Sequence, residues 1–121
     1  MGEVRHFRYG ELSYKDATGG ARQMELARLI TDRESRTLGA GLARFDHCSV
    51  DWTVLYDEVM FVFEGTFRLA VGDRRYVCTP GDMLWIPERT TLKYESDGPS
   101  VCFYAVYPAD WRKRHGVPEP A

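Results

Sequence analysis

Short apolar runs in this chain alternate with turn signals at intervals of roughly eight to twelve residues from about Gly39 onward. The turns contain Gly, which adopts positive φ readily, or Pro, which fixes φ, and both residues close tight connections. The runs between the turns are rich in Val, Tyr, Phe and Trp, which strands favour. We therefore expect strands over Glu58–Phe63, Phe67–Val71, Arg75–Thr79, Met83–Ile86, Thr91–Glu95 and Val101–Tyr107. This pattern predicts an all-β sandwich or barrel.

The segment Tyr56–Phe63 is apolar on both faces of the expected strand. Side chains alternate between the two faces, so that Glu58, Met60 and Val62 share one face while Val59, Phe61 and Phe63 share the other. An apolar face of this size is rarely left in water. Strands from Glu3–Ile30 can cover it, or a second copy of the chain can, and we expect a homodimer.

The segment Ala21–Ser35 is ambiguous. Its Ala, Leu, Glu, Arg and Met content suits a helix. A short strand over Leu26–Ile30 is also compatible with the sequence, and the all-β context favours it. At the other end, Pro108–Ala121 contains three prolines and a basic patch, which suggest a short turn or helical cap and a frayed tail.

Length and charge limit the possible functions. A chain of 121 residues is one compact domain, in which 1–40 form N-terminal strands or an arm and 112–121 form a tail. The 16 Lys and Arg residues nearly balance the 18 Asp and Glu residues, which argues against a nucleic-acid partner.

The apolar runs and the cysteines suggest a location. The longest apolar run, Val59–Phe63, is far too short to span a membrane, and the first residues are too charged for a signal peptide. Three cysteines without a CxxC pair suggest reduced, buried and inert thiols. We therefore expect a cytoplasmic protein.

Two motifs within residues 41–111 resemble those of the cupin superfamily. Glu58 and Gly65 have the separation of the Glu and Gly of the first cupin motif. The run from Gly81 to Pro87 matches the G-D-x-x-x-I-P of the second motif. The resemblance implies a single cupin domain with a jelly-roll β-barrel or sandwich.

Within the cupins, the chain resembles EutQ-type (ethanolamine utilisation protein Q-like) proteins. The resemblance is carried by W-T-V-L-Y-D-E at Trp52–Glu58, by Ile86-Pro87 and by Y-A-V-Y-P-A-D-W at Tyr104–Trp111. It implies a role in ethanolamine-type metabolism. That family has been linked to an acetate kinase activity that transfers phosphate from ATP to acetate.

Of the cupin metal ligands, which are three His and one Glu, only the Glu has its counterpart here, in Glu58, and at most Asp51 could join it as a donor. The histidine positions of the motifs fall on Trp52 and Val54, or on Asp51 and Thr53 in the alternative spacing, and the last one falls on Leu92. His47 lies between Asp46 and Cys48, but neighbours on a strand point to opposite faces and cannot converge on one ion. We expect no metal and no other cofactor, and we interpret His47 as a loop residue.

Glu58 is the candidate site residue, because its strand face would direct it into the barrel. A buried carboxyl group can act as a general acid or base, or can bind a ligand amine or hydroxyl. Alternatively, Glu58 is a satisfied carboxyl group that only supports the fold. The aromatic side chains that can line a ligand pocket, or belong to the plain core, are Trp52, Tyr56, Trp85, Tyr94 and Tyr104.

Three functions remain open. The first is binding of a small polar metabolite near Glu58. The second is acetate-kinase-type phosphotransfer, although the sequence has no G-x-x-x-x-G-K-[ST] phosphate loop. The third is a non-catalytic accessory or structural role in an ethanolamine pathway.

Overall fold

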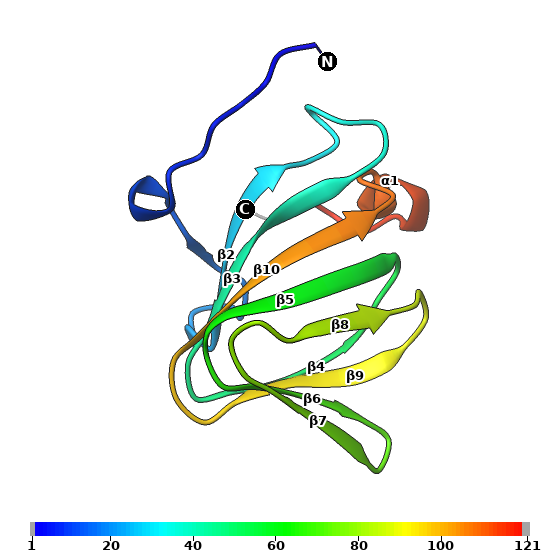
Figure 1. Ribbon diagram of the computed structural model, residues 1–121. Helices are drawn as coiled ribbons and strands as arrows, with labels where there is room; N and C mark the ends of the chain where they lie inside the picture. The colour runs from blue at the N-terminus through cyan, green and yellow to red at the C-terminus, as the bar shows by residue number, and fades with distance from the viewer. Residues whose placement is uncertain (1, 120–121) are drawn as a thin grey trace.

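The computed structural model describes residues 2–119, which form two antiparallel sheets packed face to face (Figure 1). The first sheet has the strand order β1-β2-β3-β10-β5-β8, and the second has the order β4-β9-β6-β7. The strands are β1 Lys15–Asp16, β2 Met24–Ile30, β3 Gly39–Phe45, β4 Cys48–Thr53, β5 Asp57–Gly65, β6 Phe67–Val71, β7 Arg74–Cys78, β8 Met83–Ile86, β9 Thr91–Ser96 and β10 Ser100–Tyr107. This arrangement confirms the all-β sandwich.

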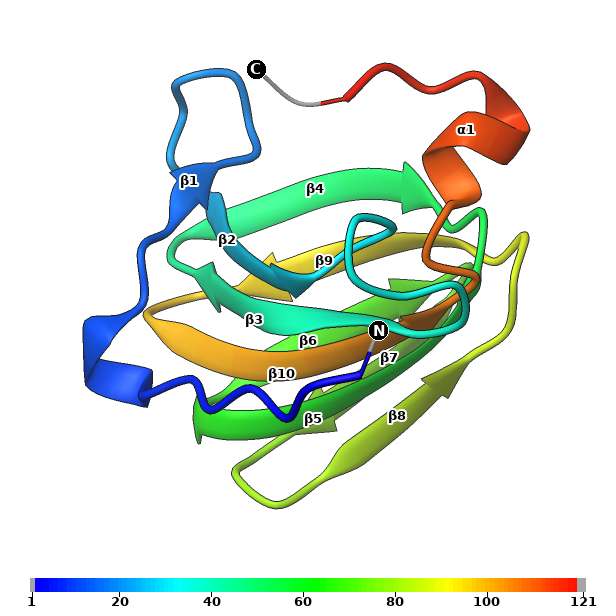
Figure 2. The ribbon, with the colours of Figure 1, turned by 90° about the horizontal axis from the view of Figure 1, so that it is seen from above.

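Two short helices lie outside the sheets. A 3-10 helix, η1, spans Tyr9–Glu11 in the N-terminal arm. The α-helix α1 spans Trp111–His115 and lies at one end of the sandwich, beside the end of β4 (Figure 2). A helical cap was one of the two structures expected after Pro108. No helix within residues 2–119 has the length and apolar character needed to cross a membrane.

The strands expected from the apolar runs are confirmed, with shifts of one or two residues at their ends. The ambiguous segment Ala21–Ser35 contains the strand β2, so the strand interpretation was correct. Gly39 to Gly41 begin β3. Position 41 requires glycine, because a Cβ there would lie 2.2 Å from the Ala27 carbonyl oxygen and 2.7 Å from the Tyr104 hydroxyl.

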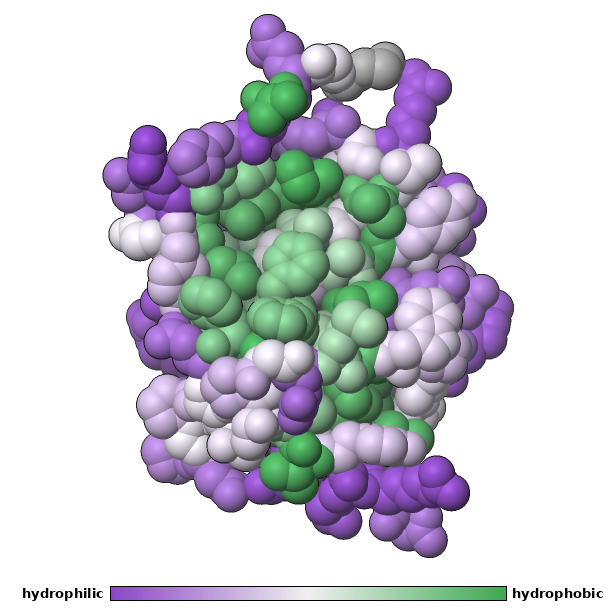
Figure 3. Space-filling model, in the orientation of Figure 1, coloured by the Kyte–Doolittle hydropathy of each residue, from purple (hydrophilic) through white to green (hydrophobic). Residues whose placement is uncertain are grey.

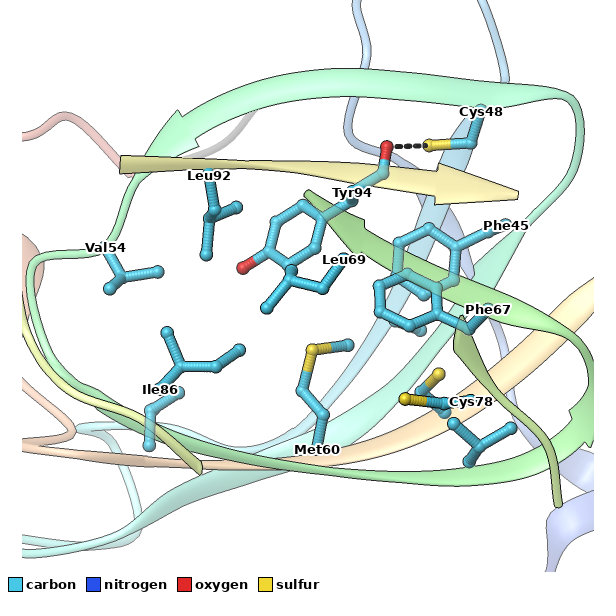
Figure 4. Packing of buried hydrophobic residues seen from close by; sticks show 14 of the residues in the cluster. Phe45, Cys48, Val54, Met60, Phe67, Leu69, Cys78, Ile86, Leu92 and Tyr94 are labelled. Carbon is cyan, nitrogen blue, oxygen red and sulfur yellow. Dashed lines mark hydrogen bonds between the residues drawn. The ribbon is translucent and has the colours of Figure 1, made fainter. Parts of the chain in front are cut away.

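The core lies between the sheets, and both sheets contribute large side chains to it (Figure 4). Phe45 from β3 packs against Phe67 from β6, with ring centroids 4.8 Å apart. Met60 from β5 and Tyr94 from β9 extend this contact toward the middle of the sandwich. The three cysteines are buried and free, as expected, and burial raises the pKa of each thiol.

The opposite face of the first sheet carries an outer apolar face, formed by Val59, Phe61, Phe63, Met83, Trp85 and Phe103. Figure 3 shows hydrophobic residues gathered at the centre of this side of the molecule, over β3, β10 and β5. The N-terminal arm covers only part of it: the Tyr9 ring meets Phe63 edge-on at 5.0 Å, yet Phe63 stays 47% exposed. The sequence required this face to be covered, and one chain does not cover it fully.

Candidate functional site

A cavity of about 560 Å³ lies between the sheets and is lined by residues of β2, β3, β4, β5, β9, β10 and α1. Of the six candidate residues, it brings together five: Trp52, Tyr56, Glu58, Tyr94 and Tyr104. Its volume lies within the range of pockets that bind small molecules. The cavity is therefore the candidate site.

Glu58 lies on β5 with its side chain directed inward, and only 5% of the residue is exposed. Its Oε1 accepts a hydrogen bond of 3.0 Å from the hydroxyl of Tyr94. No other hydrogen bond from residues 2–119 reaches the carboxyl group, and no buried side-chain oxygen of those residues lacks a partner. The second oxygen of Glu58 is therefore accessible from the cavity.

Burial sets the protonation of this carboxyl group. Removal from water disfavours the charged form and raises the pKa of Glu58 to about 7, while the bond from Tyr94 acts in the opposite direction. Glu58 can therefore either donate or accept a proton near neutral pH.

The tyrosines around Glu58 remain protonated hydroxyl groups. Burial, followed by the nearby carboxyl group, raises the pKa values of Tyr56 and Tyr94 well above their usual range. Burial also raises the pKa of Tyr104 to about 12. These groups are hydrogen-bond donors and acceptors in the cavity wall, not bases.

An aromatic cluster closes one part of the wall. The indole nitrogen of Trp52 donates a 3.0 Å hydrogen bond to the hydroxyl of Tyr56. Trp111 of α1 packs against Tyr56, with ring centroids 4.8 Å apart, and meets Trp52 edge-on at 6.2 Å. The helix thereby joins the wall of the cavity.

Trp85 does not belong to this site, and its assignment to the pocket was wrong. It pairs with Val59 across β8 and β5, so it lies on the outer apolar face, where it is 61% exposed. Strand alternation is the reason, because Leu84 and Ile86 occupy the inward positions of β8.

The residues at the cupin ligand positions do not suit a metal ion. Val54 and Leu92 are buried hydrocarbon side chains in the core, and Trp52 bonds to Tyr56. Within residues 2–119, no three His, Cys, Asp or Glu side chains are grouped closely enough to hold an ion. His47 is exposed and contacts Asp46 in the turn between β3 and β4, in agreement with its interpretation as a loop residue.

The lining residues that sequence reasoning missed include Arg28, Trp111 and Arg112. Trp111 was quoted within a family motif but was not assigned to the site. Arg28 lies on the same face of β2 as Met24 and Leu26, and a register shift separates it from Ile30, which also lines the cavity. The sequence signal for Arg28 was a single charged residue in a series of alternating apolar residues. Burial lowers the pKa of this guanidinium from its usual value.

Comparison with known proteins identifies relatives of the chain. The family described as "Ethanolamine utilisation protein EutQ" matches residues 10–113. The chain is similar to "Acetate kinase EutQ" of Clostridioides difficile (strain 630), with 30% identity over 72% of this chain and 55% of that protein. The chain thus spans about half the length of this curated relative.

Solved structures agree with these matches. The Clostridium difficile EutQ protein structure is 29% identical, with a TM-score of 0.71 over 76% of this chain and 75% of the other. An RmlC-like cupin from Shewanella frigidimarina NCIMB 400 is 21% identical, with a TM-score of 0.69 over 90% of this chain and 96% of the other. The second likeness establishes the cupin fold.

Proposed function

Because the chain belongs to the EutQ family, we propose that it binds a small polar metabolite in the cavity beside Glu58, in ethanolamine-type metabolism. The observation that carries the proposal is the pair of Glu58 and Tyr94. One oxygen of the carboxyl group is held by the tyrosine and the other is open to the cavity. A fold-supporting carboxyl group would have both oxygens satisfied by the protein.

The tyrosine and tryptophan side chains support recognition of a polar ligand. Trp52, Tyr56 and Tyr104 supply apolar area together with hydroxyl or indole groups, so they can contact both parts of a small organic molecule. Glu58 would donate or accept a hydrogen bond at the bound molecule. Its pKa of about 7 also suits a general acid or base.

The test is ligand-induced thermal stabilisation, because only a compound that prefers the folded state raises the midpoint. Ethanolamine, glycolamide and glycolate serve as probes for the wild type and for Glu58→Gln. The exposed Glu88 gives the matched control Glu88→Gln. We expect at least one probe to stabilise the wild type and the control more than Glu58→Gln. Equal shifts in all three proteins would contradict a ligand site at Glu58.

A second candidate is phosphotransfer between ATP and acetate. It is favoured by the name of the curated relatives, acetate kinase EutQ, and by the two guanidinium groups at the cavity, Arg28 and Arg112. Phosphoryl transfer needs cationic groups and usually Mg²⁺ to neutralise the developing charge. The decisive assay measures acetyl phosphate formation from acetate, ATP and Mg²⁺, with Arg28→Gln as the comparison. Absence of product would leave ligand binding or an accessory role.

We also propose that the protein is a cytoplasmic homodimer. The outer apolar face supports the dimer, since Phe61 and Phe103 are paired across β5 and β10 and are about two-fifths exposed. The buried, unpaired cysteines support a reducing compartment.

A further inference from the structure

Arg28 is the charged residue on the inward face of β2. Its neighbours on that face, Met24 and Leu26, line the same cavity and are apolar, as is Ile30 beyond the register shift. Desolvating a guanidinium beside such residues costs free energy unless a partner compensates its charge. A partner for the charge of Arg28 must therefore come from another element or from a ligand.

Within residues 2–119, no carboxylate lies at ion-pair distance from Arg28, and its side chain donates no hydrogen bond to them. No buried side-chain nitrogen of these residues lacks a partner. The guanidinium nitrogens therefore keep some exposure, and Arg28 lines the cavity.

The other carboxylates near the cavity are engaged elsewhere or exposed. Asp16 accepts hydrogen bonds from Thr18 and Gly20 in its own loop. Asp32 is paired with Lys113 at 3.0 Å. Asp51, whose side chain is 83% exposed, faces Lys93. Glu119 is exposed at the rim, and its charge acts to raise the pKa of Arg28 without forming an ion pair.

The strand register places Arg28 and Glu58 at opposite ends of one stretch of the first sheet's inner surface. Arg28 pairs with Gly41 and Gly41 pairs with Tyr104, so the three lie in one row across β2, β3 and β10. Glu58 lies on the next strand, β5, displaced by two residues from that row. Three strand spacings and this displacement separate the backbones of Arg28 and Glu58 by roughly 16 Å along the curved sheet, a gap that the two side chains and a ligand would span together. Gly41 has no side chain, and the Tyr104 hydroxyl lies over it, between the cation and the carboxyl group.

Arg112 adds positive charge at the cavity rim. Its guanidinium lies 4.5 Å from the centroid of the Trp111 ring and donates a hydrogen bond of 2.9 Å to the Pro118 carbonyl. Burial is the main cause that lowers the pKa of Arg28, and the charge of Arg112 lowers it further, while Tyr104 and Glu119 act in the opposite direction. An anion between the two guanidinium groups would relieve their repulsion.

We propose that the cavity takes a small hydroxycarboxylic acid, whose carboxylate is held by Arg28 and whose hydroxyl group reaches Glu58. This assignment rests on the proposed function and names the class of its ligand. The planar guanidinium can bind a carboxylate or a phosphate through two parallel hydrogen bonds, so charge decides between the two anions. A phosphate dianion would bring a second charge to a wall whose nearest side chains on β2 are apolar.

The test is an NMR titration of the full chain at pH 7.5. The probes are 3-hydroxypropanoate, 4-hydroxybutanoate and 5-hydroxypentanoate, each compared with its neutral amide, and inorganic phosphate. We expect an acid to bind more tightly than its amide in the wild type. Arg28→Gln should weaken the binding of the acid by about tenfold or more, because a charge-assisted hydrogen bond is lost, and should leave the binding of the amide unchanged. Arg28→Lys should keep part of the preference for the acid over its amide. Arg74 is an exposed arginine of β7, and Arg74→Gln should keep all of this preference.

The outcomes separate this inference from the proposed function. If acids and amides bind the wild type equally and Arg28→Gln changes neither, the carboxylate assignment is wrong while the Glu58 site stands. If phosphate binds more tightly than every acid, the assignment to carboxylates is also overturned. If no acid and no amide binds, both proposals fail for this ligand class. The comparison of acid with amide in the wild type holds even if Arg28→Gln does not fold.

Discussion

The hydroxyl of Tyr94 on β9 donates a 3.0 Å hydrogen bond to Oε1 of Glu58 on β5, and this bond joins the two sheets across their interior. Both residues are buried, so water does not compete freely for the bond. The bond orients the carboxyl group and counteracts part of the burial effect on its pKa. It therefore couples the stability of the sandwich to the protonation of the candidate site.

Stability should decrease with pH through the titration of Glu58. The pKa is raised from 4.5 to about 7 in the folded protein, so the stabilisation is fully present below about 4.5 and is lost as pH rises through about 7. The difference corresponds to roughly 3 kcal/mol at most. Urea unfolding should therefore show Glu58→Gln gaining stability relative to wild type between pH 5 and 8. A difference that is independent of pH, or a similar gain in Glu88→Gln, would contradict the burial of an ionisable Glu58.

Removing the Tyr94 hydroxyl should raise the pKa of Glu58 further. Tyr94→Phe deletes the donor that favours the charged carboxylate and leaves burial unopposed. NMR titration of the labelled Glu58 carboxyl carbon measures the pKa. We also expect a loss of about 1 kcal/mol in unfolding free energy. The exposed Tyr76→Phe is the control, and a lower pKa in Tyr94→Phe would show that the bond does not act on Glu58.

Gly41→Ala should destabilise the protein by about 1–3 kcal/mol or more, because overpacking forces side chains and backbone apart. The new Cβ would lie 2.2 Å from the backbone oxygen of Ala27, which cannot move without shifting β2. Gly98→Ala is the matched control, since a Cβ there meets nothing within 4 Å. Thermal unfolding of both variants checks the expectation. Equal midpoints would mean that β2 and Tyr104 do not approach Gly41 closely in solution.

Light scattering should give twice the 13.9 kDa mass of one chain at tens of micromolar. Replacing Phe61 and Phe103 by Ser should shift the mass toward the monomer, because these side chains form the centre of the outer apolar face. Val77→Ser removes an exposed apolar side chain of β7 in the other sheet and should leave the dimer intact. A monomeric wild type would contradict the proposed homodimer.

Elemental analysis of protein purified without a metal-affinity tag should find well under one equivalent of Zn, Fe, Ni, Mn or Cu. Trp52, Val54 and Leu92 stand at the ligand positions, and neither an indole nor a hydrocarbon side chain can replace an imidazole as a donor. Dialysis against a weak chelator distinguishes a bound ion from a contaminant. Stoichiometric metal that survives dialysis would overturn this expectation.

The local sequence determined the strands and the inward position of Glu58. Gly and Pro close the turns, and period-two alternation assigns each side chain to a face, so β5, β6 and β8 could be located within a few residues. The same alternation directs Glu58 inward between Tyr56 and Met60. The cupin and EutQ motifs led to the fold family, because their residues lie at matching intervals along the chain.

Only the tertiary structure decided which distant residues meet. Helix propensity competed with strand pairing over Ala21–Ser35, and pairing of β2 with β3 settled the outcome and placed Arg28 in the cavity wall. Trp85 looked equivalent to Trp52 in sequence, but the pairing of β8 with β5 directs it outward. The bond between Glu58 and Tyr94 spans 36 positions and two sheets. Such contacts depend on sheet order and curvature, which arise from the packing of the whole chain and not from any local pattern.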